Sequence, residues 1–367
     1  MKKQKEQKKV RVGFVGVGGM GQAAHLRHYT QVPNCEVVAL AEVRPELAKK
    51  VAAKWGVPKV YTDFEEMLKK EKLDAVVSSQ PFTFHGTLMP KILKYKIPLL
   101  TEKPIAGSVA MGEVVLRAAK ANKVPMMIGY HKRSDPAAMA AKKEVERLKK
   151  SGELGKLKYV RITMPAGDWV ANGFCQNIHS TEPYPAHAYD PPAADMDKDT
   201  NNAYVGFVNY YIHQVNFMRY ILGETWKPTY AAPSGVMLAG ESKSGVACTL
   251  EMSPYETSYD WQEVILVCFE TGWVRITLPA PLTTNRAGKL EIFRDARATW
   301  KDGKMVMPES APRHEEIQLP WVGAMWQQAQ NFVNAVQGKR DVACCTPEDA
   351  LEDIKFAREF IKLWKGK

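Results

Sequence analysis

The chain has 367 residues, of which 45% are hydrophobic and 25% are charged, and its formal net charge is +11. This composition is that of a globular protein, and the length suits two domains better than one. No run approaches the about 18 consecutive apolar residues of a membrane-spanning helix, and the start lacks the apolar segment of a secretory signal. We therefore expect no membrane partner and a cytoplasmic location.

Part of the positive charge lies at the start of the chain, where residues 1–9 hold five lysines against Glu6. Such a tail is typical of a solvated terminus, and because no nucleic-acid-binding motif accompanies it, no nucleic-acid partner is predicted. The six cysteines form no C-x-x-C pair and have no other metal-ligand spacing. We expect buried free thiols and no metal site.

The first third of the chain alternates short apolar runs with stretches of helical character. The apolar runs cover 10–15, 36–41, 75–79, 98–101 and 125–129. Helices are predicted between them at 20–31, 45–55, 64–70, 86–94 and 108–122. Continuous apolar strands separated by helices are typical of a parallel sheet that is covered on both faces. Residues 1–130 are therefore predicted to form an α/β domain.

The rest of the chain has a different pattern. A helix at 136–150 and a strand at 157–164 precede a long polar, proline-rich stretch at 166–202 and a helix at 204–222. Residues 227–310 are predicted to form strands and turns, with strands at 246–252, 263–270, 273–278 and 289–293. No helices lie between these strands, which favours antiparallel pairing. Helices at 322–337 and from 346 onward end the chain. Residues 131–367 are therefore predicted to form an α+β domain.

A glycine-rich turn, Gly16-Val17-Gly18-Gly19-Met20-Gly21, lies between the first strand and the first helix. It has the spacing of a Rossmann dinucleotide-binding turn, in which the helix N-terminus offers N–H groups to the pyrophosphate. Glu42 ends the second strand, where an acid accepts hydrogen bonds from the ribose hydroxyls. It would repel the 2′-phosphate of NADP, whereas Arg44 could pair with that phosphate. NAD is favoured as the cofactor, and NADP stays open.

Two further motifs carry groups suited to hydride-transfer chemistry. Glu102-Lys103-Pro104 follows the strand at 98–101, at the sheet edge that faces ligands. The lysine can bond a substrate hydroxyl and stabilise a developing alkoxide, or it can be a surface residue paired with Glu102. Asn209 and His213 share one face of a helix. The histidine can accept a hydroxyl proton, or it can be a partly buried residue bonded to its neighbours.

These motifs together resemble the family of glucose–fructose oxidoreductase, inositol dehydrogenase and MocA (Gfo/Idh/MocA). The resemblance extends over nearly the whole chain. It rests on the glycine motif, Leu73-Asp74-Ala75-Val76-Val77 leading to His85, Glu102-Lys103-Pro104, Gly129-Tyr130-His131 with Arg133, and the helix bearing His213 before Gly223. It implies a Rossmann domain followed by a domain whose open, mostly antiparallel sheet often forms oligomer contacts. A homo-oligomer, dimer or tetramer, and a cis peptide before Pro104 are also expected.

The resemblance implies roles for individual residues. Lys103 and His213 would flank the nicotinamide, where a sugar or cyclitol hydroxyl is oxidised. Asn209 stands where the family usually has an aspartate, so it can orient the histidine ring but brings no charge. The expected cofactor ligands are Gly16, Gly18, Gly19, Met20, Gly21, Glu42, Arg44, His85, Glu102 and Lys103. The expected substrate ligands are Lys103, Arg133, Trp169, Tyr184, His187, Tyr189, Asn209 and His213.

The function that these residues favour is hydride transfer between NAD(P) and a secondary hydroxyl of a sugar, a glycoside (at C3 by family analogy) or a cyclitol. The stretch Tyr184-Pro185-Ala186-His187 also has a faint likeness to a motif of NAD-dependent glycosidases. A retained-cofactor glycosidase or internal redox transferase is therefore an alternative. A non-catalytic, dinucleotide-binding regulatory protein is a third hypothesis, which Asn209 keeps open.

Overall fold

The computed structural model describes the chain except residues 1–7, 187–188, 254, 309–310, 340–341 and 367, so His187 and most of the lysine-rich tail lie outside the described residues. The chain divides into two compact units. Unit 1 comprises Met1–Ser134, Asn172–Ile212 and Met325–Lys355, and unit 2 comprises Asp135–Ala171, His213–Ala324 and Phe356–Lys367. Within the described part, no helix is both long and apolar enough to cross a bilayer.

Unit 1 is built on a parallel sheet of six strands in the order β3-β2-β1-β4-β5-β6. The strands are β1 (Val10–Val15), β2 (Cys35–Ala41), β3 (Lys59–Tyr61), β4 (Ala75–Ser78), β5 (Leu99–Glu102) and β6 (Met126–Gly129). The connecting helices are η1 (Gly21–Leu26), α1 (Arg27–Tyr29), α2 (Pro45–Trp55), α3 (Phe64–Lys70), η2 (Phe82–Phe84), α4 (His85–Leu93) and α5 (Val109–Asn122). The short η3 (His131–Ser134) follows β6. This doubly wound arrangement is the Rossmann topology that the sequence predicts.

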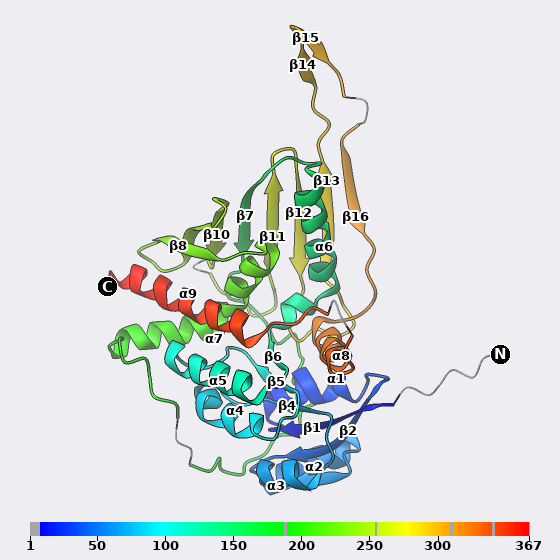
Figure 1. Cartoon of the computed structure of the whole chain (residues 1–367), viewed down its shortest axis with the longest axis vertical. Helices are drawn as coiled ribbons and strands as arrows, with labels where there is room; N and C mark the ends of the chain where they lie inside the picture. The colour runs from blue at the N-terminus through cyan, green and yellow to red at the C-terminus, as the bar shows by residue number, and fades with distance from the viewer. Residues whose placement is uncertain (1–7, 187–188, 254, 309–310, 340–341, 367) are drawn as a thin grey trace, which may run out of the picture. The chain divides into compact units, whose positions relative to one another are not determined.

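The sheet of unit 1 is buried on both faces. On one face, Val12 and Phe14 of β1 pack with residues of η1, α2 and α8 (Ala324–Val336). On the other face, α3 contacts β1 and β2, and α4 and α5 pack against each other (Figure 1). Local signals explain the helix ends: Pro45 begins α2, and Gly56 ends it with a positive φ of 68°.

Unit 2 is built on a sheet of eight strands in the order β16-β13-β12-β11-β7-β10-β9-β8. All neighbouring strands are antiparallel except β7 and β10, which pair in parallel. The strands are β7 (Leu157–Thr163), β8 (Trp226–Ala231), β9 (Met237–Ser242), β10 (Ala247–Glu251), β11 (Glu263–Phe269), β12 (Gly272–Leu278), β13 (Lys289–Arg294) and β16 (Arg313–Ile317). Buried and half-buried residues alternate along β11, as expected of a sheet with one packed face.

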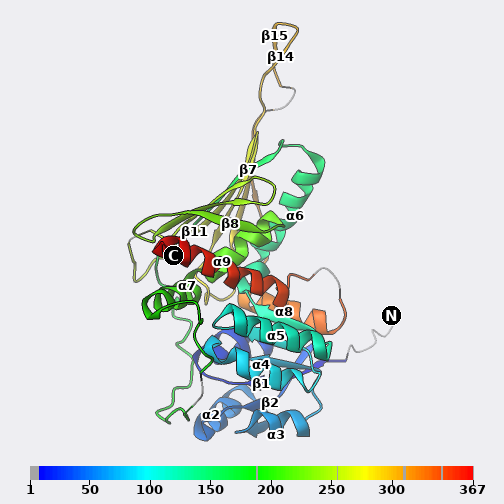
Figure 2. The same cartoon turned by 60° about the vertical axis from the view of Figure 1, so that its left-hand side comes forward.

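Helix α6 (Pro136–Ser151) packs on β12 and β13. A hairpin of β14 (Thr299–Lys301) and β15 (Lys304–Val306) extends away from the main sheet of unit 2 (Figure 2). Two long helices, α7 (Lys198–Leu222) and α9 (Pro347–Lys365), continue from one unit into the other.

The predicted fold class, a Rossmann domain with an additional, mostly antiparallel α+β domain, is confirmed. The domain boundary at residue 130 stays a prediction.

Several sequence predictions of local structure are wrong. No strand is predicted at β3 or β16. Strands β8, β9, β14 and β15 fall in the stretch 227–310 that is predicted to form strands and turns, but outside the individual strands predicted there. Helix α7 begins at Lys198, inside the stretch expected to be irregular. The cysteines are free, but Cys175 is exposed rather than buried.

Candidate active site

The glycine-rich turn after β1 needs glycine where the chain approaches itself. Gly16 has a φ of +86°, and a Cβ there would lie 2.6 Å from the carbonyl oxygen of Ser79. A Cβ on Gly21 would lie 2.6 Å from the carbonyl oxygen of Gly16, so Gly21 allows η1 to start close to the strand. At Gly18 a Cβ would meet nothing nearer than 3.5 Å. The atoms nearest to that position are Oη of Tyr184 at 3.5 Å and Nη2 of Arg44 at 3.6 Å, so these two side chains face the backbone of Gly18.

Glu42 follows β2 and is nearly inaccessible, with 3% of its surface exposed. Its carboxylate accepts hydrogen bonds from the backbone N–H of Val17 at 3.0 Å and from Nε of Arg44 at 2.7 Å. The acid is thus fixed beside the glycine-rich turn, and the guanidinium balances its charge. This is the geometry expected of an acid that receives the ribose of a dinucleotide.

A cavity of about 620 Å³ opens beside this acid, at the carboxyl ends of β1, β2 and β4. Among its lining residues are Gly16, Glu42, Gln80, Phe84 and Tyr184. The cavity has the location and size expected for the adenosine half of a dinucleotide. The glycine cradle, the fixed acid and the cavity together fit NAD.

The Glu-Lys-Pro motif begins on the last residue of β5. The peptide between Lys103 and Pro104 is cis, as the resemblance implies. The ammonium group of Lys103 donates a hydrogen bond to the main-chain oxygen of Asn209 at 2.7 Å. Burial lowers the pKa of Lys103 to about 8, partly countered by the nearby charge of Glu102. The ammonium group of Lys103 therefore binds the main chain of helix α7, and not Glu102 as in the alternative interpretation of the motif.

Glu102 has a different partner, which no sequence motif indicates. Its Oε1 lies 2.6 Å from Nε2 of His25, a buried residue of η1. Burial raises the pKa of Glu102, but the hydrogen bond and charge of His25 outweigh burial and hold it at about 2. This pair ties the helix of the glycine-rich turn to the strand that carries Lys103. A single histidine in an apolar helix gives no sequence signal for such a contact.

Asn209 and His213 lie one turn apart on α7, as predicted. Asn209 is exposed and belongs to unit 1, whereas His213 is half-buried and is counted with unit 2. The main-chain bond from Lys103 reaches the turn that precedes His213. The catalytic roles of these three residues stay predictions.

Two other predicted ligands have buried structural contacts. The ring of His85 is fully buried, with Nδ1 at 2.9 Å from the carbonyl oxygen of Pro104 and Nε2 at 3.2 Å from that of Gln80. Burial lowers the pKa of His85, and a neutral imidazole has only one N–H to donate to these two carbonyl groups. The guanidinium of Arg133 is buried and donates to Asp349 at 2.9 Å.

The aromatic residues expected at the substrate lie in different places. Tyr184 lines the cavity beside Glu42, and Tyr189 stacks on Phe84 with ring centroids 4.7 Å apart, both in unit 1. Trp169 is half-buried in unit 2. Their roles as substrate ligands stay predictions. Among the described residues, no group of three or more His, Cys, Asp or Glu side chains is placed to hold a metal ion.

Comparison with known proteins identifies the first domain. Residues 10–130 match the model of an oxidoreductase family with an NAD-binding Rossmann fold, Gfo/Idh/MocA. An inositol 2-dehydrogenase of Corynebacterium glutamicum (strain R) is 25% identical over 345 residues, which are 90% of this chain and 86% of that protein. An inositol 2-dehydrogenase of Rubrobacter xylanophilus is 31% identical over 141 residues, 38% of this chain and 40% of that protein.

Similarity in structure extends over the whole chain. The structure of scyllo-inositol dehydrogenase from Lactobacillus casei with bound NAD(H) and scyllo-inositol matches with a TM-score of 0.66 at 16% identity, covering 98% of each chain. At this identity the match shows a shared fold. In sequence, the chain spans 40% of the length of the Rubrobacter xylanophilus protein and 65% and 62% of the lengths of two other relatives. The glycine cradle, the fixed acid and the family match agree: residues 10–130 form the NAD-binding Rossmann domain of the Gfo/Idh/MocA oxidoreductase family.

Proposed function

We propose that the protein is an NAD-dependent dehydrogenase or reductase that acts on a secondary hydroxyl of a cyclitol or sugar. One observation carries this proposal. Lys103 follows β5 at the ligand-binding edge of the Rossmann sheet, and its ammonium group contacts the main chain of α7 one turn before His213. The ammonium group of Lys103 is thus bonded to the same helix, α7, that carries the imidazole of His213. Inositol dehydrogenases among the relatives favour a cyclitol as the first substrate to test.

The chemistry of these side chains suits oxidation of an alcohol. NAD, when bound, supplies the acceptor for the hydride. The ammonium group of Lys103 has three N–H donors, so the bond to Asn209 leaves two for a substrate oxygen. Its positive charge stabilises negative charge on that oxygen as the proton leaves. The imidazole of His213 accepts the proton.

The position of Glu42 supports NAD over NADP. Its carboxylate faces the place where the ribose of a bound dinucleotide lies in this fold, and a 2′-phosphate there would meet a buried negative charge. Arg44 is engaged by that same carboxylate at 2.7 Å. A phosphate would have to compete with Glu42 for the guanidinium.

The function is tested by following NADH absorbance with inositols, monosaccharides and glycosides, each with NAD and with NADP. We expect turnover with NAD on one substrate class and a loss of about 100-fold or more in kcat/KM for Lys103→Ala and for His213→Ala. Lys143→Ala, an exposed lysine of α6, is the control and retains activity. Binding of NAD without turnover across the panel would contradict the enzyme hypothesis and favour a regulatory protein.

A second function, redox-assisted glycoside cleavage or internal transfer with a retained cofactor, has one observation in its favour. The chain segment that carries Tyr184 is bonded to the glycine-rich turn, to η1 and to α2. A segment fixed beside the dinucleotide site favours a cofactor that stays bound. In that case mass spectrometry detects an altered glycoside while NADH absorbance stays constant. The same assay, run on substrates blocked at C3, tests whether that hydroxyl reacts.

The oligomer that we propose, a dimer or tetramer, is tested by sedimentation.

A further inference from the structure

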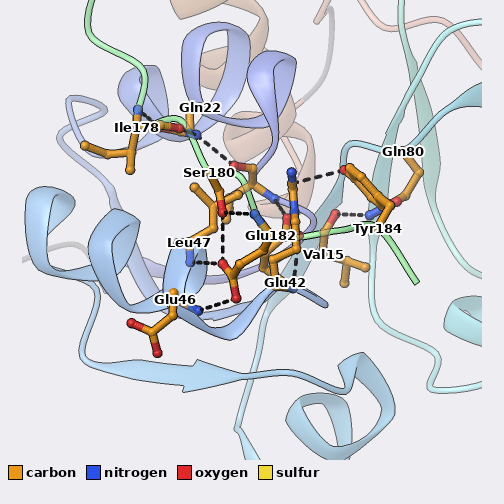
Figure 3. Close-up of polar contacts among 12 residues, drawn as sticks. Val15, Gln22, Glu42, Glu46, Leu47, Gln80, Ile178, Ser180, Glu182 and Tyr184 are labelled. Atoms are coloured by element: carbon orange, nitrogen blue, oxygen red, sulfur yellow. Dashed lines mark hydrogen bonds and ion pairs between the residues drawn. The ribbon is translucent and has the colours of Figure 1, made fainter.

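A segment of the long stretch before α7 lies against the dinucleotide site of unit 1. We call residues 174–184 the strap. Figure 3 shows its contacts with residues around the glycine-rich turn and the start of α2. The strap is far from these partners in sequence, with Gln22 and Ile178 separated by 156 positions. Its placement therefore depends on specific bonds, which fall into three groups.

The first group fixes the strap to the helix of the glycine-rich turn. The side chain of Gln22 donates to the main-chain oxygen of Ile178 at 3.0 Å and accepts from its N–H at 2.8 Å. Asn177 donates to the main-chain oxygen of Gly19 at 3.0 Å. Ile178 also packs against the buried core of the domain. The two hydrogen bonds between Gln22 and the backbone of Ile178, together with the packing of the Ile178 side chain, fix the position of this segment along η1.

The second group fixes the strap to the N-terminus of α2. The carboxylate of Glu182 accepts hydrogen bonds from the N–H groups of Glu46 at 3.1 Å and Leu47 at 2.8 Å (Figure 3). Ser180 donates to the same carboxylate at 3.0 Å. A carboxylate at a helix N-terminus bonds unpaired N–H groups and interacts favourably with the helix dipole. Glu182 thus acts as a capping residue supplied from outside the helix.

The third group is at the cavity itself. Tyr184 accepts a hydrogen bond from Nη2 of Arg44 at 3.1 Å, and the guanidinium carbon lies 4.1 Å from the ring centroid. Beyond the strap, Asp190 accepts from the N–H groups of Gly86 at 2.7 Å and Thr87 at 3.1 Å, at the start of α4. The chain is therefore bonded to α2 before Tyr184 and to α4 after it. Thr87 at the second attachment and Tyr184 between the two attachments both line the cavity.

Apart from the bond between Arg44 and Tyr184, the bonds of the strap do not involve the groups that a dinucleotide is expected to use. They engage the carbonyl oxygen of Gly19 and the N–H groups of α2, and not the N–H groups of the glycine-rich turn that bind a pyrophosphate. The Glu42 carboxylate accepts from Val17 and Arg44 and makes no bond to the strap. An attachment of this kind is compatible with a bound cofactor.

We propose that the strap retains the dinucleotide. It lies beside the adenosine half of the site, where Tyr184 lines the cavity and stacks on the guanidinium of Arg44, so that NAD leaves only after the strap detaches. This inference rests on the proposed binding of NAD to the glycine-rich turn. It assigns Glu182 and Tyr184 to cofactor retention, a role that differs from the substrate contact expected of Tyr184.

The test is the rate at which NADH leaves, measured by its fluorescence after a chase with excess NAD. Glu182→Ala and Tyr184→Ala are expected to release NADH about tenfold faster or more, which corresponds to about 1.4 kcal/mol. Tyr259→Ala removes a tyrosine that is 98% exposed in unit 2 and is the matched control, with an unchanged rate. Unchanged release in both strap variants would overturn the proposal. Tighter NADH binding in them would overturn it too, because the strap would then exclude the cofactor.

Hydrogen exchange separates failure of the strap from failure of the site. With NAD present, we expect slower exchange both in the turn at 16–21 and in the strap at 174–184. Slower exchange in the turn alone means that NAD binds without engaging the strap, which overturns the retention proposal only. Unchanged exchange in both segments overturns the proposed cofactor site, and the retention proposal with it.

Discussion

At the scale of single residues, the pair of Glu42 and Arg44 combines two opposite preferences. The carboxylate repels a 2′-phosphate, whereas the guanidinium attracts one. With Nε of Arg44 at 2.7 Å from Glu42, the acid neutralises the residue that would otherwise bind the phosphate. The preference for NAD therefore depends on Glu42 both directly and through its hold on Arg44.

We predict that Glu42→Gln shifts the ratio of kcat/KM for NADP over NAD upward by about tenfold or more, since one charge repulsion is removed and Arg44 is released. Glutamine keeps an oxygen for the N–H of Val17, so the turn is preserved. Glu36→Gln, which changes an exposed acid within β2, is the control. An unchanged cofactor ratio would show that the acid does not face the ribose.

A second prediction concerns Asn209, where the family usually has an aspartate. Asn209→Asp places a carboxylate one turn before His213, which stabilises the imidazolium and raises its pKa. The acidic limb of the pH profile of kcat/KM should move to higher pH by up to about one unit. The main-chain oxygen that binds Lys103 is unaffected by this change.

Asn202→Asp adds the same charge two turns earlier on α7, in an exposed position, and serves as the control. It should leave the profile in place because solvent screens the added charge over that distance. Equal profiles for the wild type and Asn209→Asp would argue against His213 as the titrating base.

The parts of the site that could be predicted are those in which sequence neighbours determine the geometry. Gly16, Gly21 and Glu42 follow directly from the strand–turn–helix pattern, because each glycine relieves a contact with nearby backbone. The contacts of His25 with Glu102 and of Gln22 with Ile178 have no local signal. They depend on which distant segment the tertiary fold brings to that surface, so sequence patterns could not reveal them.

At the scale of elements, the missed strands lie mostly at the edges of the sheets. Strand β3 has three residues, two of them exposed, and β16 carries mostly charged side chains. Strand β8 contains Pro228, which is tolerated at an edge because no ladder bond is needed there. Central strands such as β1 and β11 were predicted because burial requires the apolar runs that edge strands lack.

The start of α6 provides a prediction for a single element. Asp135 caps this helix through the N–H of Ala137 at 2.8 Å and also accepts from Gly288 at 3.1 Å. Burial raises the pKa of Asp135 from 3.8 to about 6 despite these bonds. Between these two pH values the folded chain binds a proton at Asp135 that the unfolded chain lacks. The contribution of this residue to stability therefore falls as the pH rises through that window.

Relative to Asp135→Asn, which cannot titrate, the wild type should gain about 1 kcal/mol in free energy of unfolding when the pH is lowered from about 7 to about 5. Urea unfolding of both proteins at each pH measures this difference. Asp63→Asn at the exposed cap of α3 controls for loss of a capping carboxylate at the surface. A difference that is constant with pH would show that Asp135 does not titrate in this range.

At the scale of the whole molecule, the chain passes between the two units within helices. The boundaries at 212/213 and 355/356 lie inside α7 and α9. Helix formation is cooperative along the chain, so unfolding one side of such a helix removes hydrogen bonds that also support the other. Two domains joined by a flexible linker would lack this connection. We therefore expect the two units to unfold together.

Binding of NAD tests this expectation, since the glycine-rich turn belongs to unit 1 and most tryptophans belong to unit 2. Unit 2 holds seven of the nine, namely Trp169, Trp226, Trp261, Trp273, Trp300, Trp321 and Trp364. If unfolding is coupled, NAD at about 100 times its Kd stabilises the whole chain by about 2.7 kcal/mol, and the urea midpoint seen by tryptophan fluorescence rises. Gly18→Ala is the control, because its Cβ lies no nearer than 3.5 Å to another residue but blocks the approach of a pyrophosphate. This variant should have the wild-type urea midpoint without NAD and show no rise of the midpoint with NAD. If NAD slows hydrogen exchange at the glycine-rich turn but does not change the urea midpoint seen by tryptophan fluorescence, the two units unfold independently despite their shared helices.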